Sequence, residues 1–229
     1  MTIYFVRHGH PDYKNDCLTE LGKKQAQKAA ERLRDSGIET IYASTKGRAM
    51  ETAEYTAREL GLDVVSCDFM REIGWGPIGD EELPEGGHPW KLARSLAAEG
   101  ISITNPDWRE MEPFCRSVLG ERVDTVVDGF DALMAELGYQ REGEYYRVCG
   151  ENTDKTVAIF SHGGSSTAVL AHLLNVPFLH ACGFIHVEFT SITVIRLPNT
   201  PGELVIPKLI GANDVKHLKD VTVENVYGN

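Results

Sequence analysis

The chain has 229 residues, 42% of them hydrophobic and 25% charged, which is typical of a soluble globular protein with one domain. Its formal net charge of −11 argues against nucleic acid or an anionic membrane as a main partner. No apolar run approaches the roughly 20 residues of a membrane span, and the N-terminus enters a predicted strand without a secretory signal. The five widely spaced cysteines predict neither a disulfide framework nor a zinc site. We expect a cytoplasmic protein in which local positive charge captures any anionic substrate.

The first apolar run, residues 3–6, reads as a buried strand that ends in Arg7-His8-Gly9. Open α/β sheets bind their ligands at the carboxyl ends of strands. An arginine suits a phosphate there because its planar fork donates two parallel hydrogen bonds, and a neutral histidine can be a nucleophile. His10, the next residue, is a candidate substrate contact. Taken alone, this segment is weak evidence, and a strand cap with a solvated arginine and a hydrogen-bonded histidine is the favoured interpretation.

Strand and helix alternate over the first 67 residues, which predicts a parallel sheet with helices on both faces. Thr19 is predicted to cap a helix that stops at Gly37, and Ser44 a second helix that stops at Gly61. The strands after the first are expected at 40–43 and 63–67.

Glycine and proline interrupt this pattern between residues 74 and 90, which predicts a loop. An irregular helical stretch is expected from 90 to about 120, and a strongly amphipathic helix from 121 to 137 with its apolar stripe toward the core. We expect residues 77–154 to form a helical cap insertion over the carboxyl edge of the sheet. Its aromatic side chains could line a substrate pocket, but the core of the insertion is the favoured interpretation. They are Trp90, Trp108 and Phe114, with Trp75 just before the insertion.

The α/β pattern then resumes with a strand at 156–160 and a helix at 165–174. Two further strands are expected at 184–197 and 203–210, with a turn between them. The predicted fold is a three-layer α/β/α sandwich with a mostly parallel sheet, forming one domain over residues 1–229.

Later segments place polar residues after predicted strands, as Arg7-His8-Gly9 does. Arg48 follows the second strand, Glu72 lies in the segment MREIG, and His162-Gly163 follows the strand at 156–160. The C-terminal segment 211–218, GANDVKHL, completes the set. In this order and over nearly the whole chain, these motifs resemble the histidine phosphatase superfamily, with its phosphoglycerate-mutase-like fold, and specifically its phosphatase branch.

The candidate phosphate-binding residues are Arg7, Arg48, His162 and Gly163. The two arginines are permanently cationic, and His162 adds a donor if it is protonated. The glycine lets the backbone approach a phosphoryl group, and the following helix points its positive end toward the site. The cations do the work of a metal, so neither a metal nor another cofactor is expected, and the expected partner is a small phosphorylated substrate.

The candidate catalytic residues are His8, Glu72 and His162. One ring nitrogen of His8 would attack phosphorus, while a hydrogen bond, expected to a backbone carbonyl, would hold the proton on the other. Glu72, with a pKa raised by partial burial, would protonate the leaving group and then activate water. The resemblance implies the same roles, and hence a metal-independent phosphomonoester hydrolase with a phosphohistidine intermediate.

Two alternatives to a phosphatase remain open on the sequence. In the mutases of this superfamily, the stretch between the Arg-His-Gly motif and Leu-Thr is usually longer than the eight residues that separate Gly9 from Leu18 here. The short loop favours a phosphatase. The chain could also be a binding or regulatory protein on the same scaffold, but all five positions to which the resemblance assigns a role are filled, by Arg7, His8, Arg48, Glu72 and His162. The substrate and the oligomeric state are not determined at this stage.

Overall fold

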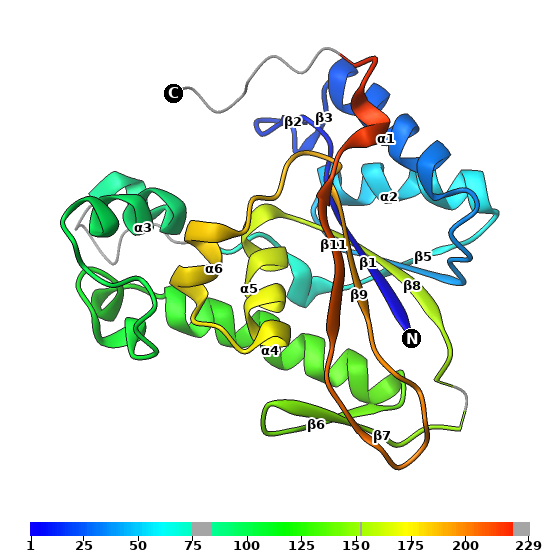
Figure 1. Ribbon diagram of the computed structural model, residues 1–229. Coiled ribbons are helices and arrows are strands. Elements are labelled where there is room, and N and C mark those ends of the chain that lie inside the picture. Colours follow the sequence, from blue (N-terminus) through cyan, green and yellow to red (C-terminus); the bar gives the residue numbers. More distant parts are fainter. Residues whose placement is uncertain (75–83, 152, 222–229) are drawn as a thin grey trace.

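Within residues 1–74, 84–151 and 153–221, which the computed structural model describes, the central sheet has six strands. Across the sheet their order is β11 (Lys208–Asp214), β9 (Ile192–Arg196), β1 (Thr2–Arg7), β8 (Thr156–Ser161), β4 (Thr40–Ala43) and β5 (Val64–Ser66) (Figure 1). Strands β1, β8, β4 and β5 are parallel, whereas β9 runs against both of its neighbours. The mostly parallel sheet predicted from the sequence is confirmed.

Helices cover both faces of this sheet because alternate side chains of β1 point to opposite sides. Ile3 and Phe5 face one core, where the Phe5 ring lies 6.0 Å from that of Phe130. Val6 faces the other core, together with Leu33. The covering helices are α1 (Glu20–Leu33) and α2 (Gly47–Leu60) on the Val6 side, and α4 (Leu119–Glu136) and α5 (Gly163–Leu174) on the Phe5 side (Figure 1).

Helix α1 starts where the sequence predicts. The Thr19 hydroxyl accepts a hydrogen bond from the Gly22 N–H at 3.1 Å, and so satisfies one of the first-turn donors of the helix. The helix ends at Leu33, earlier than the predicted stop at Gly37, which lies in the following turn with φ +75°.

Helix α2 begins later than predicted, and the expected cap is wrong. Lys46, not Ser44, precedes the first helical residue. The Ser44 hydroxyl lies 2.8 Å from Nε2 of His162, which follows the neighbouring strand β8. This side chain therefore forms its hydrogen bond with His162 and does not cap the helix. The predicted end is confirmed, since Gly61 closes α2 in the left-handed conformation with φ +68°.

In the C-terminal half, β8 and α5 confirm the strand and helix expected at 156–160 and 165–174. The strand expected at 184–197 is wrong in its first half, because the chain forms α6 (Phe178–Phe184) and then a loop before β9. Thr190, with φ +55°, turns this loop across the end of β1. The strand expected at 203–210 divides into β10 (Leu204–Val205) and β11.

The expectation that all of 77–154 caps the carboxyl edge is also wrong, although its residues 77–83 lie outside those described. Helix α3 (Pro89–Ala98) does reach that edge. Helix α4, however, must bury its apolar stripe and forms part of a sandwich layer. The hairpin of β6 (Tyr139–Glu142) and β7 (Tyr145–Val148) lies at the opposite end of the sheet, where the N-terminal amine of Met1 donates to the Tyr139 hydroxyl (Figure 1).

The aromatic residues of this stretch divide between core and edge. Trp108 and Phe114 are buried and pack edge to face with ring centroids 5.8 Å apart, as expected of core residues. Trp90 is only half-buried and lies beside Gly163 at the start of α5. Trp75 lies outside the described residues.

Short elements connect these layers. A hairpin of β2 (Pro11–Asp12) and β3 (Cys17–Leu18) joins β1 to α1, and single 3-10 turns are found at Asp68–Met70, Pro84–Gly87, Trp108–Glu110, Phe114–Arg116 and Lys216–Leu218. In the described part of the chain, no single helix has both the length and the hydropathy to cross a membrane. Helices α5 and α6 pass that test only as a pair, bent by 114°.

The segment after β1 is packed against the start of α1 with no room for a side chain. A Cβ on Gly22 would lie 2.2 Å from the backbone oxygen of His10, and a Cβ on Gly9 would lie 2.6 Å from the backbone oxygen of Gly22. These two glycines therefore set how closely the Arg-His-Gly segment approaches the helix.

We expect Gly22→Ala to lower the free energy of unfolding by about 1–2 kcal/mol, because the clash with the His10 carbonyl exceeds the helix propensity that alanine adds. Urea denaturation measures this. Gly211→Ala is the matched control: its Cβ would meet no atom within 4 Å, and its effect should stay within about 0.5 kcal/mol. Equal unfolding midpoints for the two variants would contradict the close approach.

Candidate active site

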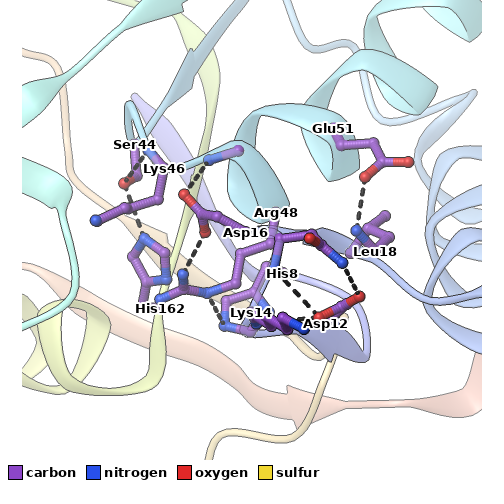
Figure 2. Close-up of polar contacts among 12 residues, drawn as sticks. His8, Asp12, Lys14, Asp16, Leu18, Ser44, Lys46, Arg48, Glu51 and His162 are labelled. Carbon is purple, nitrogen blue, oxygen red and sulfur yellow. Dashed lines mark hydrogen bonds and ion pairs between the residues drawn. The ribbon is translucent and has the colours of Figure 1, made fainter.

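The carboxyl ends of β1, β4 and β8 bring His8, Arg48 and His162 together (Figure 2). The rings of the two histidines lie 5.1 Å apart between centroids, and Arg48 Nε lies 3.3 Å from His8 Nε2. Exposed fractions are 1% for His8, 0% for His162 and 8% for Arg48. Three of the predicted site residues thus form a compact, buried cluster.

The backbone orients the His8 ring. Its Nδ1 lies 2.7 Å from the carbonyl oxygen of Gly9, which can only accept, so Nδ1 carries the proton. Nε2 is left with a lone pair and accepts from Arg48 Nε. Burial, together with the nearby His162 and Arg7, lowers the pKa of His8 well below its usual value. The ring is therefore neutral near pH 7, and its unprotonated Nε2 can act as a nucleophile. The partner of Nδ1 is a backbone carbonyl, as the sequence analysis predicts.

Arg7, the last residue of β1, is 8% exposed, and its charge acts on the neighbouring His8. Its Nη1 donates to the carbonyl oxygen of Val187 at 2.6 Å. Its guanidinium carbon lies 4.1 Å above the ring centroid of Phe189, which is within cation–π range. The loop that precedes β9 therefore holds this cation.

Arg48 is held by the loop that follows the Arg-His-Gly segment. Its Nη1 forms an ion pair with Asp16 Oδ1 at 2.5 Å, and the other carboxylate oxygen of Asp16 accepts from the Gly47 N–H at 3.0 Å (Figure 2). A Cβ on Gly47 would lie 2.1 Å from the Asp16 carbonyl oxygen, so this loop packs directly on the first residue of α2. Asp16 compensates a nearly buried positive charge.

His162 lies at the end of β8 and precedes α5. Its Nε2 lies 2.8 Å from the Ser44 hydroxyl, and its buried Nδ1 has no hydrogen-bond partner among the described residues. Burial and the charges of Arg48 and Arg7 lower its pKa to about 2. The condition set from the sequence, that His162 be protonated in order to donate, is not needed: the ring is neutral, and when Ser44 donates to Nε2 the ring donates through Nδ1.

Glu72 connects this cluster to the start of α5. Its Oε1 accepts from the backbone N–H groups of Ile73 and Gly164, both at 3.0 Å. Burial raises the pKa of Glu72, while the charge of Arg7 opposes the shift. Because Oε1 already accepts two hydrogen bonds, a proton on this carboxyl belongs on Oε2.

The remaining predicted residues lie at the edges of the cluster. The His10 N–H donates to Gln25 Oε1 at 2.7 Å and its Nδ1 lies 2.9 Å from the Thr19 hydroxyl, so the ring is oriented by the start of α1. A Cβ on Gly163 would lie 3.7 Å from the guanidinium carbon of Arg7 and 3.6 Å from the indole of Trp90. Glycine at this position keeps the space beside the Arg7 guanidinium open.

Sequence reasoning missed several residues that orient the cluster. Asp16 carries no motif that would single it out in a polar loop, and Phe189 looks like part of a strand. The type and position of Ser44 predict a helix cap instead of a contact with His162. The contacts that they make join segments far apart in the chain, so local pattern contains no signal for them.

The model of the histidine phosphatase superfamily (branch 1) matches residues 3–206. This chain belongs to that superfamily. A probable phosphoglycerate mutase GpmB of Erwinia tasmaniensis is 34% identical over 236 residues, covering 99% of both chains.

Solved structures share the fold of this chain. The native mycobacterial glucosyl-3-phosphoglycerate phosphatase is 27% identical, with a TM-score of 0.64 and coverage of 93% of this chain and 98% of that one. The fold also resembles a phosphoserine phosphatase of Entamoeba histolytica in complex with 3-phosphoglyceric acid, at 22% identity and a TM-score of 0.63, covering 95% of this chain and 98% of that one.

The buried neutral histidines make the protein less stable in acid. Because the pKa of His162 is about 2 when folded and near 6.5 when unfolded, the unfolded chain binds one more proton between those values, so stability falls as pH drops below 6.5. Between pH 6 and 5, the free energy of unfolding of His162→Gln should fall by about 1 kcal/mol less than that of the wild type. Urea denaturation at the two pH values measures this difference. Parallel losses in both proteins would show that His162 is not buried in its neutral form.

Proposed function

We propose that the chain is a phosphomonoester hydrolase that transfers the phosphoryl group to Nε2 of His8 and then to water, without a metal ion. The observation that carries this proposal is the hydrogen bond from His8 Nδ1 to the Gly9 carbonyl, which leaves the Nε2 lone pair facing Arg48. A neutral, fixed imidazole beside two buried guanidinium groups is what nucleophilic attack on a phosphate dianion requires.

In the first step the Nε2 lone pair forms a bond to phosphorus, and the bond between phosphorus and the ester oxygen breaks. Arg7, Arg48 and His162 donate to the peripheral oxygens, and Gly163 gives them room at the start of α5. The leaving oxygen takes the bond electrons and a proton from Glu72, whose raised pKa makes the protonated form accessible.

In the second step the Glu72 carboxylate accepts a proton from water as the oxygen of that water attacks phosphorus. The bond between phosphorus and Nε2 breaks, its electrons return to the ring nitrogen, and orthophosphate leaves. His8 regains its neutral form and Glu72 its proton, so the cycle closes with one water consumed for each ester.

The loop after Gly9 favours hydrolysis over mutase chemistry. It folds into the short β2–β3 hairpin, whose turn Asp12 stabilises by accepting from the backbone N–H groups of Lys14 and Asn15. The same loop places the Asp16 carboxylate on Arg48. A carboxylate there repels the second phosphate of a bisphosphorylated intermediate, whereas a monoester needs only the cluster around His8.

The names of the relatives divide between the two chemistries, so the assay must separate them. The curated relatives are named probable phosphoglycerate mutases, while the structure at 27% identity is a phosphatase. We propose a small phosphorylated substrate and a cytoplasmic location. With 3-phosphoglycerate as probe, a hydrolase releases orthophosphate and a mutase forms the 2-phospho isomer.

We expect hydrolysis of a nitrophenyl phosphate in excess chelator, and we expect His8→Ala to lower the rate by at least about 10³-fold because no nucleophile remains. A colorimetric assay measures the rate, and phosphate labelling of the protein detects the intermediate. His180→Ala is the matched control, since His180 stacks on Phe184 in α6, away from the cluster.

Three results would overturn this function. Activity retained by His8→Ala would exclude His8 as the nucleophile. Isomerisation of 3-phosphoglycerate without orthophosphate release would establish the mutase instead. Absence of turnover together with tight binding of orthophosphate would establish a binding protein.

We expect Glu72→Gln to slow hydrolysis of an alkyl phosphate by about 10²–10⁴-fold and to accumulate phosphohistidine with the nitrophenyl ester, which needs no protonation to leave. The amide oxygen can still accept from Ile73 and Gly164, so the geometry is kept. The steady-state rate with the alkyl phosphate measures the first effect, and a pre-steady-state burst of nitrophenol measures the accumulation of phosphohistidine. Equal losses with both esters in the rate of the first step, the formation of phosphohistidine, would contradict the role of Glu72 as acid.

The pH dependence of kcat/KM gives a second test of the same assignment. In the wild type, activity toward the alkyl ester should fall as the pH rises through the raised pKa of Glu72, because the acid is lost. Activity should also fall in acid as the pH drops through the pKa of His8, which lies well below its usual 6.5, because the nucleophile becomes protonated. The alkaline limb should disappear in Glu72→Gln while the acid limb remains.

A further inference from the structure

One aromatic ring touches three residues of the segment that starts the active site. The Phe189 ring centroid lies 5.5 Å from that of His8, 5.6 Å from that of His10 and 4.1 Å from the guanidinium carbon of Arg7. Phe189 is 4% exposed. Its ring therefore packs against both His8, the proposed nucleophile, and Arg7, a proposed phosphate-binding cation.

The loop that carries this ring is bonded to the end of β1 by the backbone. The Thr190 N–H donates to the carbonyl oxygens of Arg7 at 3.0 Å and of His8 at 3.3 Å, and the carbonyl of Val187 accepts from Arg7 Nη1 at 2.6 Å. Thr190 adopts φ +55°, a conformation that a threonine holds only when its surroundings enforce it.

The C-terminal segment supplies that enforcement. Asn213 Oδ1 accepts from the Glu188 N–H at 2.7 Å. The Thr190 hydroxyl donates to the Phe189 carbonyl at 2.8 Å and lies 3.1 Å from His217 Nε2, from which it accepts. The C-terminal segment 211–218, GANDVKHL, therefore contacts the loop at 187–190, which in turn contacts the end of β1.

We propose that Phe189 is a positioning residue that holds Arg7 and His8 for phosphoryl transfer, and that Asn213 and His217 of the C-terminal motif hold Phe189 in place. This inference rests on the proposed function, since it assigns to Phe189 the orientation of the nucleophile and of a phosphate-binding cation. The aromatic face stabilises the guanidinium in a buried site and the loop carbonyl fixes its direction.

The test compares Phe189→Leu with Phe178→Leu. Phe178, in α6, is equally buried and its ring packs against that of Trp108, so it controls for the loss of a buried ring. For each variant we would measure inorganic phosphate binding by calorimetry, the pKa of His8 by NMR titration, kcat and KM with the nitrophenyl ester, and the thermal midpoint.

We expect Phe189→Leu to weaken phosphate binding about tenfold and to lower kcat/KM by at least about tenfold, because Arg7 loses its aromatic face. The pKa of His8 should rise toward its usual value as water and a displaced Arg7 relieve its present environment. Arg48 on α2 and His162 before α5, the other ionisable groups that face His8, are unchanged. Phe178→Leu should lower the thermal midpoint by a similar amount and leave these readouts at wild-type values.

Asn213→Gly provides a second test that avoids the core. Asn213 has φ +49°, which glycine adopts freely, so this variant removes only the side-chain acceptor for Glu188. We expect smaller changes than in Phe189→Leu, because only one hydrogen bond is lost. Phosphate binding should weaken about threefold, and the pKa of His8 should rise, as in Phe189→Leu.

The inference is overturned if Phe189→Leu folds with an unchanged phosphate affinity and an unchanged pKa of His8, or if Phe178→Leu changes both equally. It is also overturned if Asn213→Gly matches the wild type in every readout. Failure of the proposed function would look different. If the wild type forms no phosphohistidine, the hydrolase proposal fails. If phosphate binding and the pKa of His8 still change in Phe189→Leu, the positioning role of Phe189 stands.

Discussion

Two nearly buried guanidinium groups whose charges act on a neutral imidazole at the end of one strand are the constraint on which this site depends. Arg7 and Arg48 are each 8% exposed, so their charges have lost most of their water. Buried charges need partners, and each arginine has its own. Asp16 pairs with Arg48, while the Val187 carbonyl and the Phe189 ring hold Arg7.

The same burial determines the chemical state of the histidines. A charged imidazole between two cations in a dry site is strongly disfavoured, so His8 and His162 are neutral, and their hydrogen bonds decide which nitrogen carries the proton. A neutral His8 whose Nδ1–H donates to a carbonyl can act as a nucleophile, and a carboxyl with a raised pKa can act as an acid. Burial has opposite effects on the pKa values of His8 and Glu72, and those opposite shifts separate their proposed roles.

Much of the fold followed from local pattern. The strand at the N-terminus, the cap at Thr19 and the left-handed glycine after α2 depend on residues close together in the chain, so periodicity and capping rules predict them. The errors have a different origin. Ser44 could cap a helix by its type and position, but it bonds to His162, 118 residues away. Residues 184–191 have strand-like composition, but the bonds of Thr190 to the end of β1 turn them into a loop.

The sequence by itself determined the family and the identity of the candidate site residues, because Arg7, His8, Arg48, Glu72 and His162 lie in motifs whose spacing and order can be read along the chain. Only the tertiary structure decided their protonation and orientation. Those depend on the Gly9 carbonyl, on Asp16, and on an aromatic ring and a C-terminal motif that reach His8 from about 180 to 210 residues away. Contacts between such distant segments leave no local pattern, and desolvation exists only once the chain has folded around the site.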